Sequence, residues 1–154
     1  MATMHQILVA IDLSEMAPTI LDRALMLAQA FDAHLVVVHV VQDLSVYMGM
    51  ALDIVPLAEW LPRREAAARE QLQALCAAAF DSSIAYDMEL LNGHPVAEIH
   101  RVIQERGVDC LVMGAHGSDR PEHQFFGSTA ERLLHLMPCL IVIVPASRAD
   151  EASP

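Results

Sequence analysis

Four short apolar segments, separated by longer amphipathic stretches, constrain the fold of this chain more than any other feature. They cover Ile7 to Ile11, Leu35 to Val41, Asp109 to Met113 and Leu140 to Val144. Continuous apolar segments of this length, rich in β-branched residues, are typical of parallel strands buried on both faces. The sequence therefore predicts a parallel sheet whose strands are joined by helices.

A fifth predicted strand, Ile84 to Leu91, differs because apolar and polar side chains alternate along it. Alternation of this kind suits a half-exposed strand at the edge of a sheet. Helices are predicted near Pro18, from Pro62, and from Pro95 to a stop at Gly107, with a fourth before the last strand. We predict a single-domain, open, five-stranded α/β sheet with strand order 3-2-1-4-5 and helices on both faces.

The predicted strand order also indicates where a ligand would bind. Open parallel sheets bind ligands at the carboxyl ends of the strands, where the winding direction reverses. In this chain that point lies between the first and fourth strands, beside the loops Asp12 to Ser14 and Gly114 to Gly117. Asp12 or Ser14 could instead cap the following helix, and the sequence leaves both roles open.

Glycines at the end of the fourth strand and at the start of the next helix suggest an anion site. Gly114, Gly117 and Gly127 lack side chains where main-chain amides would need to approach phosphate oxygens closely. The alternative is purely structural, because Ser128 and Glu131 have the spacing of a capping box. The pattern is neither a Walker loop nor a GxGxxG dinucleotide fingerprint.

The complete spacing is more specific than any single glycine. The pattern Gly114, two residues, Gly117, nine residues, Gly127-Ser128 resembles the nucleotide motif of the ATP-binding branch of the universal stress protein family. The likeness extends to both ends of the chain. Residues 6–14 look like the family's opening strand, and residues 139–145 look like its closing strand.

The resemblance implies an adenine nucleotide alpha hydrolase-like fold that binds ATP, together with Mg2+. By this resemblance, Asp12 would face the adenosine part, Val40 would line the base pocket, and Met113 and Gly114 would touch base or ribose. The full set of implied nucleotide-binding residues is Ala10, Ile11, Asp12, Val40, Met113 and Gly114, with His116, Gly117, Gly127, Ser128 and Thr129 along the phosphates.

Charge and cysteine content exclude several classes of function. The formal net charge of -11 argues against non-specific binding to nucleic acid or to an anionic membrane surface. It also makes binding of a nucleotide without Mg2+ unfavourable. The three cysteines, Cys76, Cys110 and Cys139, lie in apolar segments without metal-ligand spacing, which predicts buried thiols in a reducing compartment. No segment has the length of a signal peptide core or a membrane span, so we expect a cytoplasmic protein.

The last strand predicts self-association. Leu140 to Val144 is fully apolar and would have one unpaired side at the sheet edge opposite the alternating strand. Pairing with its copy across a two-fold axis would cover that side, and such pairing resembles the dimers of the family. We therefore predict a homodimer through this strand, with a further protein partner that the sequence does not identify.

Two functions follow from these expectations. The first is an ATP-binding regulatory protein of the stress response, a nucleotide-dependent switch with at most slow hydrolysis. Hydrolysis would be slow because only His116 and His123 could accept a proton near the glycine loop. The alternative is a nucleotide-free dimer that acts through protein-protein interaction. In both cases residues 1–147 would form the domain and residues 148–154 a short polar tail.

Three further interpretations concern residues outside the motif. Residues 42–61 lack a clear period and would form a short irregular helix packed on the core, or else cover the nucleotide or a partner surface. His39 interrupts a buried strand and is interpreted as a hydrogen-bonded core residue. Arg63, Arg64 and Arg69 are interpreted as the solvated face of a helix balanced by nearby glutamates.

Overall fold

A computed structural model of the chain describes residues 3–42, 57–117, 126–136 and 138–146. It contains one parallel sheet with strand order β3-β2-β1-β4-β5, as the sequence predicts. In chain order the elements are β1 (Gln6–Ala10), α1 (Ala17–Phe31), β2 (His34–Gln42), α3 (Leu57–Ala79), β3 (Tyr86–Gly93), α4 (Pro95–Arg106), β4 (Cys110–Gly114), α5 (Ser128–Leu136) and β5 (Leu140–Val144).

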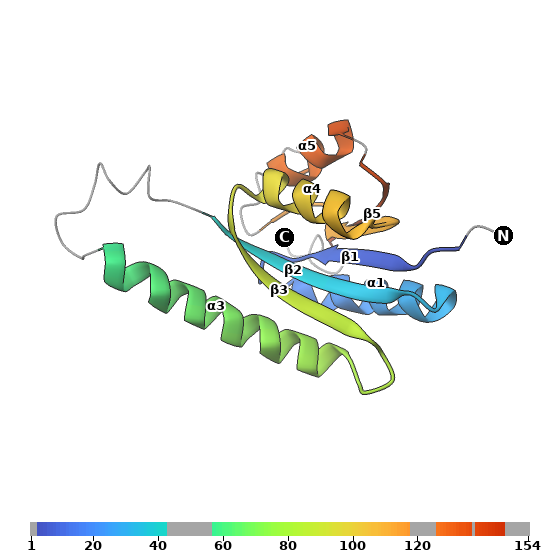
Figure 1. Ribbon diagram of the computed structural model, residues 1–154, viewed down its shortest axis with the longest axis horizontal. Coiled ribbons are helices and arrows are strands. Elements are labelled where there is room, and N and C mark those ends of the chain that lie inside the picture. The colour runs from blue at the N-terminus through green and yellow to red at the C-terminus, as the bar shows by residue number, and fades with distance from the viewer. Residues whose placement is uncertain (1–2, 43–56, 118–125, 137, 147–154) are drawn as a thin grey trace, which may run out of the picture.

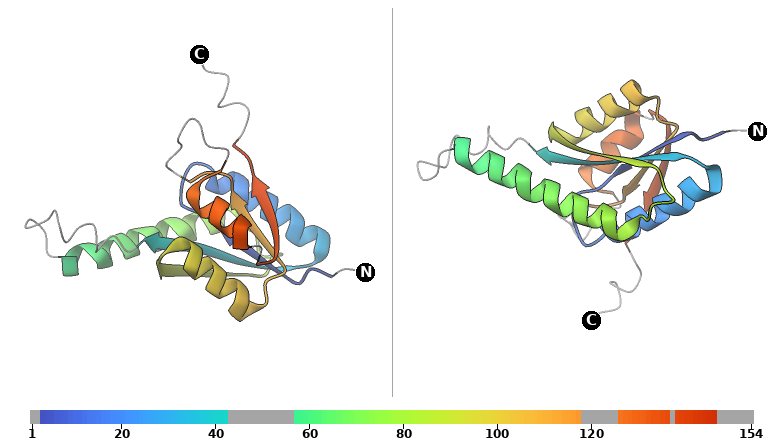
Figure 2. Two further views of the ribbon diagram at one scale, coloured as in Figure 1. Left: turned by 90° about the horizontal axis from the view of Figure 1, so that it is seen from above. Right: turned by 60° about the horizontal axis from the view of Figure 1, so that its bottom comes forward.

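The helices form two layers, one on each side of the sheet (Figures 1 and 2). Helices α1 and α3 cover one face, and α4 and α5 cover the other. Side chains alternate between these layers along each central strand: Val9, Val37 and Val112 face α1 and α3. Leu8 and Leu111 face α4 and α5. Each central strand is therefore apolar on both faces, which explains its continuous apolar sequence.

The predicted strands are present, and their ends differ slightly from the prediction. Strands β1 and β4 are displaced by one residue, and β2 is longer by one residue at each end. β3 begins at Tyr86 rather than Ile84 and includes Asn92 and Gly93, which were predicted to form a turn. Main-chain pairing with β2 continues to the register pair Gln42 and Gly93, and this pairing keeps the predicted turn residues in the strand.

The second predicted helix was assigned the wrong start. Pro62 does not open α3 but lies inside it, because the helix already begins at Leu57. A proline near the first turns removes one backbone hydrogen bond, a cost that the remaining turns of a helix of 23 residues can offset. Pro56 directly precedes the helix in the sequence and is the better start signal.

The remaining helix predictions agree with the structure. Helix α4 starts at Pro95, and its C-cap is Gly107, whose φ of 60° is left-handed. The amide of Gly107 donates to the carbonyl oxygen of Ile103, the usual way of closing a helix at glycine. In α1, the predicted inward face is buried at Leu21 and Ala24.

The two edges of the sheet also follow the prediction. β3 is the half-exposed edge strand, and its inward residues Tyr86 and Met88 pack on the layer that contains α1 and α3. β5 forms the other edge and is partly exposed from Leu140, which is 57% accessible to solvent, to Ile143, whereas Val144 is buried. None of the helices in the described ranges has the length and hydropathy required to cross a membrane.

The register of the sheet defines where the functional residues gather. Ala10, at the end of β1, pairs with Val38 on β2 and with Met113 on β4. The carboxyl ends of these three strands therefore lie side by side, and the loops that follow β1 and β4 leave the sheet at the same end. The predicted interpretation of residues 42–61 falls mostly on residues 43–56, outside the described part of the chain.

Candidate functional site

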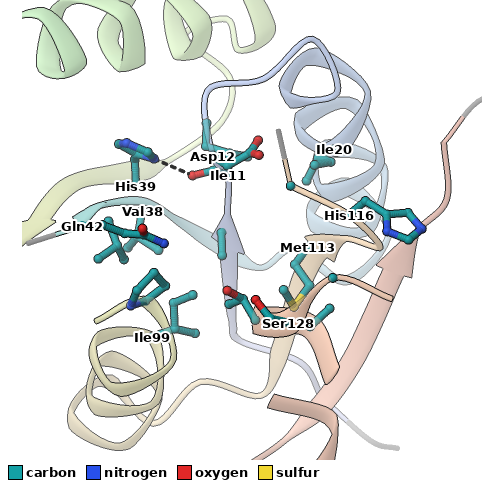
Figure 3. Close-up of a pocket in the computed structure, with 18 of the residues that line it drawn as sticks. Ile11, Asp12, Ile20, Val38, His39, Gln42, Ile99, Met113, His116 and Ser128 are labelled. Carbon is teal, nitrogen blue, oxygen red and sulfur yellow. Dashed lines mark hydrogen bonds between the residues drawn. The ribbon is translucent and has the colours of Figure 1, made fainter. Parts of the chain in front are cut away.

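A cavity of about 390 Å³ opens at the carboxyl ends of β1, β2 and β4 (Figure 3). Its size falls within the range of about 300–1,000 Å³ that is usual for small-molecule sites. The structure brings all the residues of the predicted site together in its wall: Ala10, Ile11, Asp12, Val40, Met113, Gly114, His116, Gly117, Gly127, Ser128 and Thr129. Their role as ligands remains a prediction, and their convergence on one cavity is an observation.

The cavity wall also contains residues that sequence reasoning did not select. These are Ile20, Val38, His39, Gln42, Arg64, Pro95, Ile99, Ala115 and Ala130. Gln42 belongs to the carboxyl end of a central strand, and Pro95 begins a helix. Both residues lie at the end of an element beside the crevice at the carboxyl edge of the sheet. This position could have identified them from the sequence. Arg64 comes from α3, and no local sequence pattern links it to the cavity.

The absence of a side chain has a different structural consequence at each of the three glycines. A Cβ at Gly114 would lie 3.0 Å from Cδ1 of Ile20 and 3.2 Å from the carbonyl oxygen of His116, so a side chain here would crowd the loop and α1. A Cβ at Gly117 would lie 3.2 Å from Oδ2 of Asp12. A Cβ at Gly127 would lie 3.5 Å from the main-chain nitrogen of Gly117. Gly117 and Gly127 thus leave open the space around one amide and one carboxylate.

Main-chain hydrogen bonds fix this loop to the rest of the fold. The amide of Ala115 donates to the carbonyl oxygen of Val144 on β5 at 3.0 Å. The carbonyl oxygen of Ala115 accepts from the amide of Gly127 at 2.7 Å. Ala115 therefore holds the loop after β4 against both β5 and the start of α5. The amide of Gly117 donates to no acceptor in the described part of the chain, and it remains available in this rigid setting.

Asp12 forms a turn at the end of β1 and does not cap α1. Its Oδ1 accepts from the amide of Ser14 at 3.1 Å, and the N-cap of α1 is Met16, which makes no capping bond with its side chain. The other oxygen, Oδ2, is buried and has no hydrogen-bond partner among the described residues. Leu13, which lies between Asp12 and Ser14, has a φ of 62°, an unusual conformation for a bulky residue. The turn therefore presents a carboxylate oxygen whose hydrogen-bonding capacity is unused.

The other side of the cavity has further unused polar groups. Nδ1 of His116, like Oδ2 of Asp12, is buried and has no partner in the part of the chain that the structure describes. Helix α5 begins at Ser128, and the amide of Glu131 donates to the carbonyl oxygen of Gly127. Gly127 rather than Ser128 therefore occupies the N-cap position, so the capping box interpretation does not fit. The first amides of α5 carry the positive end of its dipole, and Ser128 and Thr129 at this end of the helix line the cavity.

His39 is a hydrogen-bonded residue, as expected, and also part of the cavity wall. Its Nδ1 lies 2.8 Å from the carbonyl oxygen of Ile11 (Figure 3). Because a carbonyl oxygen can only accept, Nδ1 carries the proton and Nε2 is the acceptor of the neutral ring. Burial lowers the pKa of His39, and Arg64 lowers it further, whereas the Ile11 carbonyl and Asp12 oppose the shift.

The lowered pKa of His39 predicts a pH dependence of folding. The pKa of His39 in the folded protein is below the usual value of 6.5. At pH values between these two pKa values, His39 is protonated to a greater extent in the unfolded chain than in the folded protein. The free energy of unfolding should therefore fall as the pH decreases below about 6.5. Urea titrations across this range would measure it, with His39→Gln as the variant whose slope should be smaller. Nitrogen chemical shifts of His39 should show a neutral ring with the proton on Nδ1 at pH 7, and a doubly protonated ring would contradict this assignment.

The cysteines and the acidic residues provide no metal centre in the described part of the chain. No group of three or more histidine, cysteine, aspartate or glutamate residues there is arranged to hold an ion. Cys76 and Cys110 are buried as predicted, and burial raises the pKa of each thiol to about 11. Cys139 is only partly buried, because it precedes an edge strand.

Comparisons with family models, protein sequences and solved structures all identify the same family. A model of the universal stress protein family matches residues 3–145. Universal stress protein YxiE of Bacillus subtilis is 30% identical over 145 residues, covering 91% of this chain and 98% of the relative. A solved universal stress protein family member from Burkholderia pseudomallei is 28% identical, with a TM-score of 0.71 and coverage of 92% of this chain and 96% of that chain.

The similar solved structures include a complex with a small molecule. A universal stress protein in complex with cAMP is 21% identical to this chain and has a TM-score of 0.67. The match covers 95% of this chain and 100% of that protein. At this identity the likeness concerns the fold.

Proposed function

This chain belongs to the universal stress protein family, and we propose that it is a member that binds ATP and uses the bound nucleotide as a regulatory switch. In this proposal the nucleotide occupies the cavity at the carboxyl ends of β1, β2 and β4. Its phosphates lie against the amides of Gly117 and of the first turn of α5, and its adenosine part extends past Asp12 toward β2.

The observation that carries the proposal is a set of polar groups around the cavity whose hydrogen-bonding capacity is unused. Within the described ranges, Oδ2 of Asp12 and Nδ1 of His116 are buried without partners, and the amide of Gly117 donates to no acceptor. Buried polar groups are expensive to leave unpaired, so native proteins satisfy nearly all of them. A ligand with both donors and acceptors, such as a nucleotide, would satisfy this set. The related fold in complex with cAMP supports an adenine nucleotide.

Mg2+ would enter with the nucleotide. Mg2+ usually keeps several waters and is bound through phosphates plus one or two carboxylates. Because the described residues contain no preformed group of ligands, the phosphates and water would hold the ion. Its charge would offset part of the repulsion between a triphosphate and a chain of formal net charge -11.

Mg-ATP is expected to stabilise the purified protein. A ligand that binds only the folded state adds about 2.7 kcal/mol at a hundredfold excess over its dissociation constant. A thermal shift titration would follow this increase. Nucleotide released by denaturing the purified protein would be identified by chromatography of the supernatant. No shift at millimolar Mg-ATP, together with no released nucleotide, would favour the alternative of a nucleotide-free dimer that acts through protein partners.

Hydrolysis is proposed to be slow at most. Phosphoryl transfer requires a positioned attacking water and neutralised phosphates. In the described ranges, the titratable groups close to Gly117 are His116 and Asp12, and Asp12 is proposed to face the adenosine part rather than an attacking water. We expect phosphate release far slower than about one per second, which is slow beside typical enzymes.

We further propose that the protein is a homodimer joined through β5. The exposed side chain of Leu140 and the unpaired edge of this strand would be covered by the same strand of a second copy. Replacing Leu140 with Arg would bring a charge from each copy into the apolar interface and should give a monomer in sedimentation experiments. Replacing Met26 with Arg is the matched control, because Met26 is equally exposed but lies on α1. A Leu140→Arg variant that remains a dimer would exclude this interface.

A further inference from the structure

Arg64 is the most informative residue of the cavity that the glycine motif does not include. All nine basic residues of the chain other than histidine are arginines, and Arg64 is the one among them that lines the cavity in the described part. It is supplied by α3, whose first turns extend past the carboxyl end of β2 (Figures 1 and 2). A cation therefore reaches the site from a distant segment of the sequence.

Two contacts fix the guanidinium of Arg64. Nη1 donates to the carbonyl oxygen of Gln42 at 3.3 Å. The guanidinium carbon lies over the ring of Trp60, 5.2 Å from its centroid. An arginine held at its edge by a carbonyl and on one face by an aromatic ring has lost most of its rotational freedom, so little more is lost when its other groups bind a ligand.

Among the described residues, no carboxylate pairs with Arg64. Within the described ranges, Arg101 pairs with Glu98 and Arg106 with Asp87, but no ion pair involves Arg64. Arg64 is also only half exposed. A half-buried arginine with no carboxylate partner in the described ranges can direct its charge toward a ligand in the cavity that it lines.

The position of Arg64 indicates which part of a ligand it meets. Figure 3 shows Gln42 and His116 on opposite sides of the cavity, with the end of β1 between them. Because neighbouring strands lie about 4.8 Å apart, the ends of β2 and β4 are separated by about 10 Å. The phosphate region belongs to the β4 side. Arg64 belongs to the β2 side, where the apolar side chains of Val40, Pro95 and Ile99 line the wall.

We propose that Arg64 lies over the base of the bound nucleotide, with the guanidinium plane stacked on the base and Trp60 supporting its other face. This inference rests on the nucleotide function proposed above and extends it. Guanidinium planes commonly stack on nucleobases, and such a contact is worth more in a partly desolvated site than on the surface. Arg64 would thus make the base, and not the phosphates alone, a determinant of affinity.

The experiment compares three ligands and three variants in equilibrium competition assays. Arg64→Ala should weaken ATP and adenosine by the same factor, roughly tenfold, and leave the binding of inorganic tripolyphosphate unchanged. Arg64→Lys keeps the charge and removes the plane, so it should behave like Arg64→Ala. The control is Arg63→Ala, which removes the neighbouring exposed arginine and should bind like the wild-type protein.

The outcomes separate this inference from the function on which it rests. A loss of tripolyphosphate binding in Arg64→Ala, or full rescue by Arg64→Lys, would place the guanidinium on the phosphates and overturn the inference. Unchanged affinity of Arg64→Ala for ATP and adenosine would overturn it as well, while the nucleotide function would stand. Absence of ATP binding by the wild-type protein would overturn both. Circular dichroism of each variant ensures that a change in affinity is not a loss of folding.

Discussion

Replacing Gly127 with Val is expected to abolish ATP binding in a chain that still folds. The Cβ itself fits, because its nearest neighbours would be 3.5 Å away and the φ of Gly127 is not left-handed. The additional methyl groups of valine would cover the amide of Gly117. Hydrogen bonds to charged groups are worth about 1.5–3 kcal/mol each, so losing two phosphate contacts would weaken binding at least about a hundredfold.

A matched glycine variant tests whether the effect of Gly127→Val is local. Gly107 ends α4 with a φ of 60°, and a Cβ there would meet nothing within 4 Å. Gly107→Ala should therefore cost about 1–2 kcal/mol of stability through backbone strain alone and leave ATP affinity unchanged. Calorimetric titration and thermal unfolding of both variants would check this. Normal ATP affinity in Gly127→Val would mean that the phosphates do not lie against Gly117.

Replacing Asp12 with Asn should weaken ATP binding roughly 10- to 100-fold, the equivalent of one hydrogen bond to a charged group. The asparagine oxygen can still accept from the amide of Ser14, so the turn should persist. The second oxygen, which is unpartnered in the cavity, becomes an amide group that donates and cannot accept. We expect the stability of the unliganded protein to be unchanged or slightly higher, because a buried unpaired carboxylate oxygen is removed.

Replacing Asp109 with Asn should have effects opposite to those of Asp12→Asn. Oδ2 of Asp109 accepts from the amides of His5 and Gln6 at the amino end of β1, far from the cavity. These bonds lower the pKa of Asp109. These bonds therefore stabilise the protein fully above the pKa that Asp109 has in the unfolded chain. The stabilisation is lost as the pH falls through the lower pKa of Asp109 in the folded protein. Asp109→Asn should reduce stability near neutral pH and spare ATP binding. Similar affinities of Asp12→Asn and Asp109→Asn for ATP would contradict the assignment of Asp12.

Much of the fold could be predicted from the sequence because burial on both faces leaves a clear pattern in each central strand. Residues 7–11 and 140–144 are apolar throughout, and the alternation after Ile84 identifies the edge strand correctly. Element ends were less predictable. Pairing with a neighbouring strand extends β3 through Gly93, and tertiary context allows Pro62 inside α3. Neither effect is visible in a local window.

The candidate site was also predictable from the sequence only in part. Its loops follow strands, so strand order alone brings Asp12 and Gly117 to one cavity. Arg64 was interpreted as part of a solvated face, because its charge pattern resembles that of its neighbours on α3. Its contact with Gln42 depends on where α3 crosses the sheet end, which the sequence does not encode locally. His39 was correctly interpreted as hydrogen-bonded, but its place in the cavity wall depends on the same packing.

The central claim is that main-chain amides of the glycine loop and of the start of α5 bind the phosphates of a nucleotide. Amide resonances in a titration of the labelled protein with Mg-ATP test it most directly. The account predicts large shifts for Gly117, Ser128 and Thr129, and a small shift for Ala115, whose amide already donates to Val144. ATP binding that leaves the amides of Gly117, Ser128 and Thr129 unshifted would contradict it.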